Sequence, residues 1–160
     1  MRVQDVMTRN VKSCRPEATV DQAAMMMWDY DCGVLPVVDD DRRVMGMITD
    51  RDIAIAASTR GRLTTQIKVG EVMSGNVFAC AEDEDIRSAL NTMRRERIRR
   101  LPVINYEGRL AGILSINDVV LRAEESRVGR APEISQEDVV ATFKAICEHS
   151  RAQQQQAGMI

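Results

Sequence analysis

Two short motifs in the chain pair a hydroxyl with a carboxylate three residues later. They are Thr49-x-x-Asp52 and Ser115-x-x-Asp118, and each follows an apolar run that contains a glycine. If a helix begins at the hydroxyl, its free N–H groups and positive dipole end favour an anionic group such as phosphate. The carboxylate one turn later can accept two hydrogen bonds from a vicinal diol. The same spacing is typical of an ordinary helix-capping box, so each motif also has a purely structural interpretation.

The two motifs belong to an internal repeat with an offset of 66 residues, which is the separation of Asp52 and Asp118. The register is kept over about fifty residues, which chance does not explain. The same offset superimposes Val6-Met7 on Val72-Met73, Cys14 on Cys80, Leu35-Pro36-Val37 on Leu101-Pro102-Val103, and Gly46 on Gly112.

Each copy is predicted to form a β-α-β-β-α unit. A short strand is followed by a helix whose apolar residues share one face, then by two apolar runs joined by a polar connection, which indicates a hairpin. The second helix begins at the hydroxyl of the motif and runs to about residue 57 or 123. The expected strands are 11–14, 34–38 and 44–48 in the first copy, and 77–80, 101–104 and 110–114 in the second.

The predicted fold is therefore α/β (α+β), with two pseudo-twofold-related β-α-β-β-α repeats packed sheet to sheet and a C-terminal helix. Because each copy must bury one face of its sheet, we expect the pair rather than the single repeat to be the folding unit. The expected division is 1–57 for repeat 1, 58–66 for a connector, 67–124 for repeat 2, 125–134 for a linker, 135–151 for the C-terminal helix, and 152–160 for a frayed or disordered tail.

The composition limits the classes of partner. The chain has 160 residues, of which 44% are hydrophobic but only 3% aromatic, so the core must consist of aliphatic and Met side chains. The scarcity of aromatics and the formal net charge of -2 argue against a nucleic-acid or membrane surface as partner. No signal peptide precedes the first patterned segment and no apolar stretch is long enough to span a bilayer, which predicts a cytoplasmic location.

The residues that usually carry catalysis or bind metals are poorly placed for either role. The four cysteines form no Cys-x-x-Cys pair and are expected to be reduced and mostly buried. The only histidine, His149, lies outside the repeats, and no nucleophile and base form a recognisable pair. We therefore expect no catalytic residues, no metal site, no catalytic cofactor and no enzymatic activity.

The repeat resembles the tandem CBS (cystathionine-β-synthase) domain pair, or Bateman module, over about residues 1–124. Six pieces in one register carry the resemblance, although each alone is a weak signal. They are Asp5-Val6-Met7-Thr8, Gly33-Val34-Leu35-Pro36-Val37-Val38-Asp39, Gly46-Met47-Ile48-Thr49-Asp50-Arg51-Asp52, and their counterparts Glu71 to Ser74, Arg99 to Ile104 and Gly112 to Asp118.

In that family the Thr/Ser-x-x-Asp segment is the nucleotide signature. The resemblance thus implies that Asp52 and Asp118 hold ribose hydroxyls, with Thr49 and Ser115 near phosphate. It further implies that the adenine is bordered by Val34, Pro36, Arg100 and Pro102.

The resemblance also implies that Arg99 and Arg100 face the phosphates, whereas Gly33 and Val34 hold the matching places in repeat 1. The two sites are therefore expected to differ in affinity and in preferred phosphate count. The alternative for Arg99 and Arg100 is a solvated basic cluster with Arg94, Arg95 and Arg97. Arg51 at a helix start is a further phosphate candidate, or simply an exposed side chain.

These observations predict a regulatory protein that binds AMP, ADP or ATP, or else NAD or S-adenosylmethionine, and modulates an unknown effector protein. The alternative is a ligand-free interaction or dimerisation module. The run Met25-Met26-Met27-Trp28 cannot point wholly inward, so part of it is expected to meet a partner subunit, and the resemblance implies a homodimer. A Trp28 that lies on the C-terminal helix is the opposing interpretation.

Overall fold

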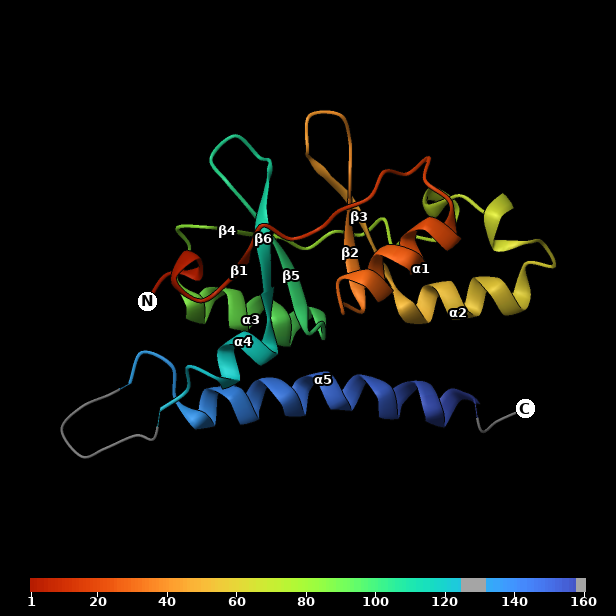
Figure 1. Cartoon of the computed structure of the whole chain (residues 1–160). Helices are drawn as coiled ribbons and strands as arrows, with labels where there is room; N and C mark the ends of the chain where they lie inside the picture. The colour runs from red at the N-terminus through yellow and green to blue at the C-terminus, as the bar shows by residue number, and fades with distance from the viewer. Residues whose placement is uncertain (125–131, 158–160) are drawn as a thin grey trace. The chain divides into compact units, whose positions relative to one another are not determined.

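The computed structural model describes residues 1–124 and 132–157, with side chains as far as Glu148. It confirms the predicted α/β class and the helix near the C-terminus (Figure 1). In chain order the elements are the 3-10 helix η1 (Val3–Asp5), β1 (Thr8–Arg9), α1 (Val20–Asp29), β2 (Val34–Val38), β3 (Val44–Thr49), α2 (Asp50–Thr59), η2 (Thr64–Gln66), η3 (Val69–Glu71), β4 (Cys80–Ala81), α3 (Ile86–Glu96), β5 (Arg100–Ile104), β6 (Leu110–Ser115), α4 (Ile116–Val120) and α5 (Gln136–Ala157).

The chain forms two compact units whose limits differ from those of the repeats. Unit 1 contains Met1–Arg9, Phe78–Ile104 and the chain from Ala111 onward, while unit 2 contains Asn10–Val77 and Asn105–Leu110. The first nine residues therefore fold with the second repeat. The residues that open the second repeat fold with the first.

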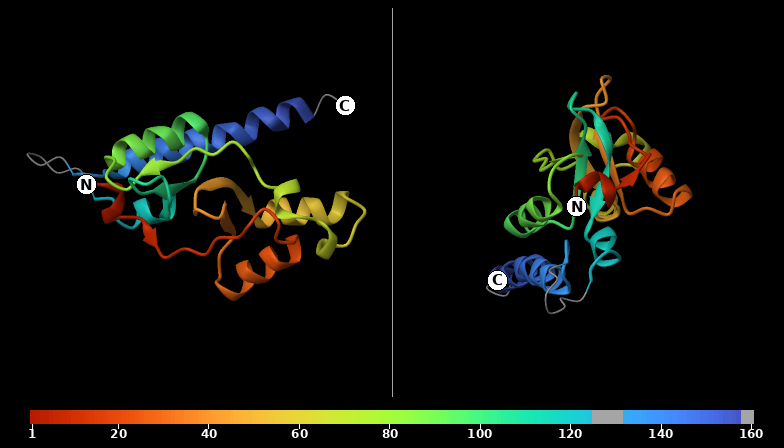
Figure 2. Two further views of the ribbon diagram at one scale, coloured as in Figure 1. Left: turned by 90° about the horizontal axis from the view of Figure 1, so that it is seen from above. Right: turned by 90° about the vertical axis from the view of Figure 1, so that its left-hand side faces the viewer.

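Unit 1 is built on a four-stranded sheet with the order β1-β6-β5-β4. β1 is antiparallel to β6, with Thr8 opposite Ile113 and Arg9 opposite Gly112, and β4 is parallel to β5. α5 runs alongside α3 and also contacts α4 (Figure 2). The N-terminal segment contributes Val3, Val6 and Met7 to the core of this unit.

Unit 2 has the same strand arrangement in a reduced form. The hairpin β2–β3 is flanked by single bridge residues, with Cys14 parallel to Val37 and Ser74 antiparallel to Met47. The expected strand at 11–14 is thus wrong except at Cys14, because Asn10 adopts a positive φ of 54° and turns the chain just before it.

Other boundaries shift by a few residues. The first strand of repeat 2 is Cys80–Ala81 rather than 77–80, α2 continues to Thr59, and α4 already ends at Val120. α5 continues to Ala157, beyond the expected end at residue 151, because Ala and Gln have favourable helix propensities. Residues 125–131 of the expected linker and 158–160 of the expected tail lie outside the described residues.

The core confirms the expectation from composition. Among the described residues, the buried hydrophobic side chains are aliphatic, Met or Cys. In the same part of the chain, no helix is both long enough and apolar enough to cross a membrane.

The opening segment of each repeat pairs with a strand of the other repeat and passes very close to a glycine of that strand. A Cβ added to Gly112 would lie 2.4 Å from the carbonyl oxygen of Thr8, and one added to Gly46 would lie 2.7 Å from that of Ser74. Because a carbonyl of a paired strand cannot move away cheaply, only glycine fits at these two equivalent positions.

We expect Gly112→Ala to lower the free energy of unfolding by about 1 to 3 kcal/mol, the usual cost of forcing extra atoms into a packed site. Urea unfolding followed by circular dichroism measures it. The control is Gly75→Ala, because a Cβ at Gly75 would meet no atom within 4 Å. Equal stability of the two variants would contradict the close approach.

Candidate functional site

Both hydroxyl–carboxylate motifs lie where a strand passes directly into a helix. Thr49 ends β3 and caps α2, and its Oγ1 and N–H donate to Asp52 Oδ2 at 2.7 and 2.9 Å. Ser115 ends β6 and caps α4, and its Oγ and N–H donate to Asp118 Oδ2 at 2.6 and 2.8 Å. The backbone N–H of each aspartate donates back to the hydroxyl oxygen. The two motifs thus have one geometry, that of a capping box.

A third box shows how much of this geometry is purely structural. Ser135 and Asp138 at the start of α5 make the same reciprocal bonds, with Ser135 Oγ 3.0 Å from Asp138 Oδ2. The other oxygen of Asp138 lies 3.5 Å from Arg94 Nη2. Capping therefore accounts for the bonds within each box. What distinguishes the two repeat motifs must be the second carboxylate oxygen and its neighbours.

In unit 1 that second oxygen faces the exchanged N-terminal segment. Asp118 Oδ1 lies 3.3 Å from Thr8 Oγ1, within hydrogen-bond distance of a residue 110 positions away. Thr8 was not among the predicted site residues. A signal for it exists in the sequence, because the repeat offset places the hydroxyl of Ser74 at the equivalent position.

In unit 2 Asp52 lines a cavity of about 180 Å³ between α2 and η3. Arg60, also in the lining, donates from Nη2 to the backbone oxygen of Glu71 at 3.1 Å. The Lys68 backbone N–H, followed by the Arg62 guanidinium, lowers the pKa of the Glu71 carboxyl. The cavity is smaller than a typical small-molecule pocket, which has a volume of ~300 Å³ or more.

The other predicted residues of repeat 1 are only partly brought together. Val34 pairs with Thr49 across the hairpin and is buried, and Pro36 is buried two residues further along β2. Arg51 is exposed, and its backbone N–H donates to the Asp50 carboxylate at 2.8 Å.

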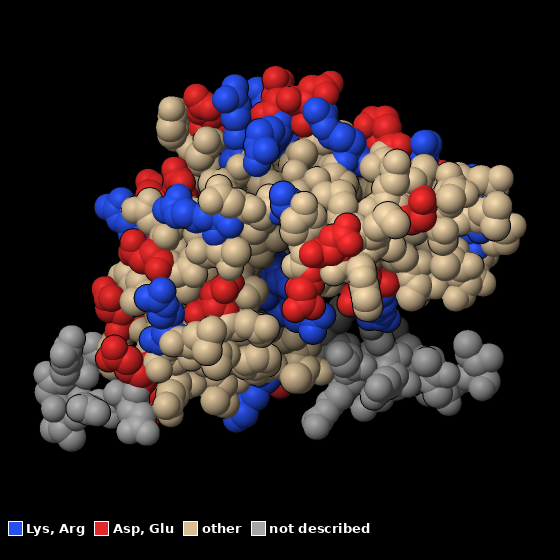
Figure 3. Space-filling view, viewed as in Figure 1, with Lys and Arg blue, Asp and Glu red and all other residues tan. Residues whose placement is uncertain are grey.

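In repeat 2, Arg99 is exposed and its carbonyl accepts from Ile116 N–H at 3.0 Å, so its backbone adjoins the start of α4. Arg100 is half-buried at the start of β5, and Pro102 is buried in the same strand. In the alternative basic cluster, Arg95 and Arg97 are exposed like Arg99, with Arg95 paired to Glu96, whereas Arg94 is half-buried and bonds to α5. On the face drawn in Figure 3, charges of both signs are interspersed.

The two repeats differ most at the residue that follows the capping hydroxyl. In repeat 1 it is Asp50, whose Oδ2 would lie 2.9 Å from a Cβ added to Gly33. In repeat 2 the equivalent residue is Ile116, which is buried. A carboxylate at the start of α2 disfavours a second anion there. The difference in phosphate preference expected from Gly33 and Val34 against Arg99 and Arg100 stays a prediction.

The cysteines are poorly suited to chemistry. Burial raises the pKa of Cys14 to about 11 and that of Cys80 to about 12, while Cys147 is exposed. All four are free thiols. No group of three or more His, Cys, Asp and Glu among the described residues is placed to bind a metal ion, and the side chain of His149 lies outside them.

The CBS domain family model matches residues 3–58 and 69–125, which include both boxes and both hairpins. The chain belongs to the CBS-domain family. It is 32% identical over 144 residues to hypoxic response protein 1 of Mycobacterium tuberculosis, covering 90% of this chain and 92% of that protein. The solved structure of that CBS protein, with two coordinated zinc ions, has a TM-score of 0.71 and covers 78% of this chain and 100% of the other.

Two further solved CBS structures contain adenosine compounds. The CBS pair of protein MJ0100, in complex with 5′-methylthioadenosine and S-adenosyl-L-methionine, is 25% identical with a TM-score of 0.68, covering 76% of this chain and 94% of that one. CBSX2 of Arabidopsis thaliana in complex with AMP is 27% identical with a TM-score of 0.63, covering 75% and 93%.

Some CBS relatives are much longer proteins. The chain is 33% identical over 130 residues to inosine-5′-monophosphate dehydrogenase of Methanocaldococcus jannaschii, which covers 81% of this chain but only 25% of the enzyme. The match to an enzyme is therefore confined to about a quarter of its length.

We expect iodoacetamide at pH 8 to modify the exposed Cys147 rapidly and to leave Cys14 and Cys80 unmodified, because burial both blocks the reagent and raises the pKa of these two thiols. The same shifts make the free energy of unfolding depend on pH. The contribution of the Cys14 and Cys80 thiols is fully present below the pKa of an unfolded thiol, ~8.5, because both states are then protonated. It is lost as the pH rises towards the folded pKa values of about 11 and 12. Peptide mass spectrometry measures the reactivity, and early labelling of Cys80 in folded protein would contradict its burial.

Proposed function

We propose that this CBS pair binds an adenine nucleotide as a regulatory ligand and catalyses no reaction. The observation that carries the proposal is the pair of boxes at equivalent places, in which Asp52 and Asp118 each use Oδ2 for capping and keep Oδ1 outside the box. A carboxylate oxygen held at a fixed position accepts well from ribose hydroxyls. AMP, S-adenosylmethionine and methylthioadenosine in the related structures support the ligand class.

The two sites take different parts of the ligand in this proposal. In unit 1 Ser115 and Asp118 bind the ribose side, Thr8 releases Asp118 Oδ1 when a hydroxyl of the ligand replaces it, and Arg99 and Arg100 attract phosphate. Pro102 borders the adenine.

In unit 2 Thr49 and Asp52 hold the ribose, with Val34 and Pro36 beside the adenine. Asp50 weakens the attraction for phosphate in this site, so Arg51 has to offset a neighbouring negative charge. ADP and ATP carry more negative charge than AMP and therefore favour the site of unit 1.

The proposed output is a change in how the chain binds an effector protein. A ligand can shift a conformational equilibrium only by its difference in affinity for the two states, so the effector must distinguish those states. The proposal includes a homodimer, supported by the exposure of Met25 and Trp28 at 66% and 86%. It also includes a cytoplasmic location, where adenine nucleotides are produced and consumed.

Thermal unfolding in the presence of AMP, ADP, ATP, NAD or S-adenosylmethionine tests the ligand. A compound at about 100 times its Kd should add ~2.7 kcal/mol to the free energy of unfolding. An absence of any shift at millimolar concentrations of all five would contradict the proposal and favour the alternative, a ligand-free interaction module.

Three matched substitutions separate ligand binding from capping. We expect Asp118→Asn and Asp52→Asn to weaken nucleotide binding in isothermal titration calorimetry at least ~10-fold, because an amide has only one acceptor oxygen. The free energy of unfolding should fall by about 1 kcal/mol or less, since the amide oxygen can still close the box. Asp138→Asn in the third box is the control and should leave nucleotide affinity unchanged. If all three variants bound the nucleotide with the same affinity, the two repeat motifs would serve only as helix caps.

A further inference from the structure

The C-terminal helix covers a defined face of α3. We name Arg87, Asn91, Arg94 and Arg95 the α3 face. Arg94 donates from Nε to Thr142 Oγ1 at 2.8 Å and from Nη2 to the carbonyl of Asp138 at 2.7 Å. Thr142 is fully buried although it is polar. The contact is therefore packed and satisfied by hydrogen bonds, not a loose surface approach.

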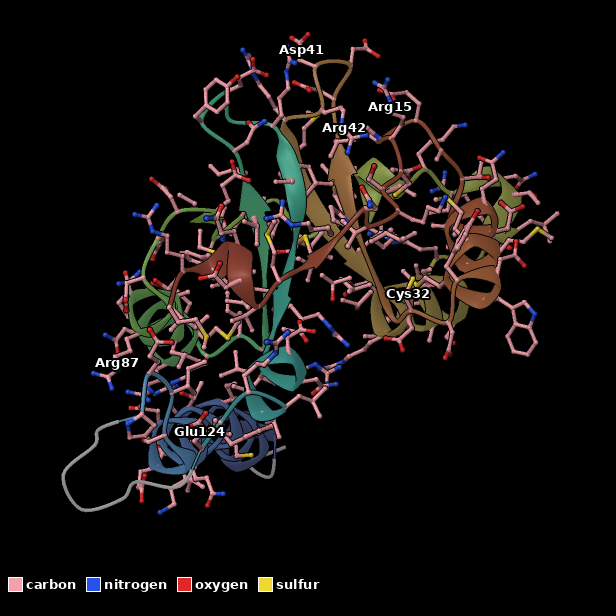
Figure 4. All side chains as sticks on the ribbon, turned by 60° about the vertical axis from the view of Figure 1, so that its left-hand side comes forward. Arg15, Cys32, Asp41, Arg42, Arg87 and Glu124 are labelled. Atoms are coloured by element: carbon pink, nitrogen blue, oxygen red, sulfur yellow. The ribbon has the colours of Figure 1, made fainter. Side chains whose placement is uncertain are left out.

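The segment that leads into α5 is held by the same face. Arg87 donates to the carbonyls of Pro132 at 2.9 Å and Glu133 at 3.3 Å, and Figure 4 shows Arg87 on α3 beside this segment. Ile134 and Val139 are buried in the core cluster that contains Leu90 of α3. Apolar burial and arginine bonds together fix the C-terminal segment on α3.

The repeat offset shows which surface of repeat 1 is equivalent to this one. It places Asp21, Met25, Trp28 and Asp29 on Arg87, Asn91, Arg94 and Arg95, and we name the first four residues the α1 face. Trp28 thus holds the position of the arginine that binds α5, and it is 86% exposed. Met25 is 66% exposed. One repeat has its helix face covered, and the other presents apolar side chains to solvent.

The two faces carry opposite charge at equivalent positions. The α1 face has Asp21 and Asp29 where the α3 face has Arg87 and Arg95. Two α1 faces placed together would bring like charges into contact, which is unfavourable. An antiparallel pairing of α1 with the α3 of another copy instead sets Asp21 opposite Arg95 and Asp29 opposite Arg87. It also brings Trp28 among arginines, where cation–π contact is favourable.

We propose that the α3 face is the docking surface for the α1 face of a second copy, and that α5 occupies this surface within its own chain. Release of α5 then promotes self-association. The inference rests on the homodimer in the proposed function and adds which faces meet and what blocks them.

The two occupants differ in what they offer to the arginines. The C-terminal segment supplies backbone carbonyls, the Thr142 hydroxyl and one carboxylate, that of Asp138, whose Oδ1 lies 3.5 Å from Arg94 Nη2. A second copy supplies two carboxylates, which attract an arginine by full opposite charge, and the exposed apolar area of Met25 and Trp28. However, α5 is tethered, which gives it an effective concentration near the millimolar range. The tethered helix therefore prevails until its own contact is weakened.

The test weakens α5 without changing either face. Thr142→Arg places a second cation against Arg94, and hydrogen–deuterium exchange over residues 136–148 reports release of the helix. Sedimentation velocity on the same full-length variant then measures self-association. We expect the dimer Kd to fall at least ~10-fold relative to wild type, and Ala141→Arg on the exposed side of α5 to leave both measurements unchanged.

A charge exchange identifies the faces that meet. In the Thr142→Arg background, Asp21→Arg should abolish the gain in self-association. Adding Arg95→Asp should restore it, because Arg95 pairs with Glu96, has no bond to the part of α5 whose side chains the structure describes, and would be replaced by a carboxylate opposite the introduced arginine.

Several outcomes would overturn the inference. If α5 is released but the dimer Kd is unchanged, the two occupants do not compete. If neither Thr142→Arg nor a second variant, Val139→Asp, releases α5, no second copy could displace it either. If every variant dimerises with the wild-type Kd, the homodimer stands and the competition fails; if no variant self-associates, the homodimer itself fails while nucleotide binding is unaffected.

Discussion

The close approach of two strands at glycines Gly112 and Gly46 is the constraint on which the rest of the structure depends. With no Cβ in the way, the backbone of Thr8 pairs with β6 and that of Ser74 with β3. The sheet of unit 1 thereby gains β1 as an outer strand, and the β2–β3 hairpin gains the single bridge residue Ser74, each from the opening segment of the other repeat. In unit 1 the same segment brings Val3, Val6 and Met7 into the core and the Thr8 hydroxyl to Asp118. A missing side chain thus determines both the packing of this unit and the composition of its candidate site.

The repeats keep one backbone plan while their side chains differ. In both repeats a strand passes directly into a helix through a capping box, and in both another helix has a face that a partner element can cover. At the helix start, however, Asp50 stands where Ile116 is buried, and on the helix face Trp28 stands where Arg94 binds α5. These differences lie outside the residues that fix the backbone, so the two halves can perform different tasks without any change of fold.

Much of the fold could be predicted from residue patterns, and the exceptions have physical causes. The hairpins and long helices were expected correctly because their apolar periodicity extends over several residues, and the boxes because their spacing is fixed by one helical turn. The single bridge at Cys14 has no periodicity to detect. The pairing of each opening segment with the other repeat was not predicted. Comparing the sequence with itself at an offset of 66 residues shows which residues are equivalent, but it gives no information on which strands pair.

The site was predictable to a similar degree. Thr49, Asp52, Ser115 and Asp118 form boxes as their spacing indicates, but Thr8 was missed because its neighbour is distant in the chain. Arg94 was grouped with a basic cluster, since its sequence neighbours are arginines. Only the structure shows that it bonds to a helix that begins more than forty residues later.

The exchanged strand also sets an order of events during synthesis. The segment that contains Thr8 leaves the ribosome before its contact residue Asp118, which follows 110 residues later in the chain. At a translation rate of ~5–20 residues per second, this segment waits roughly 5 to 20 seconds for its neighbours. During that interval Val3, Val6 and Met7 have no core to enter, so the nascent chain presents a short apolar sequence of the kind that chaperones bind.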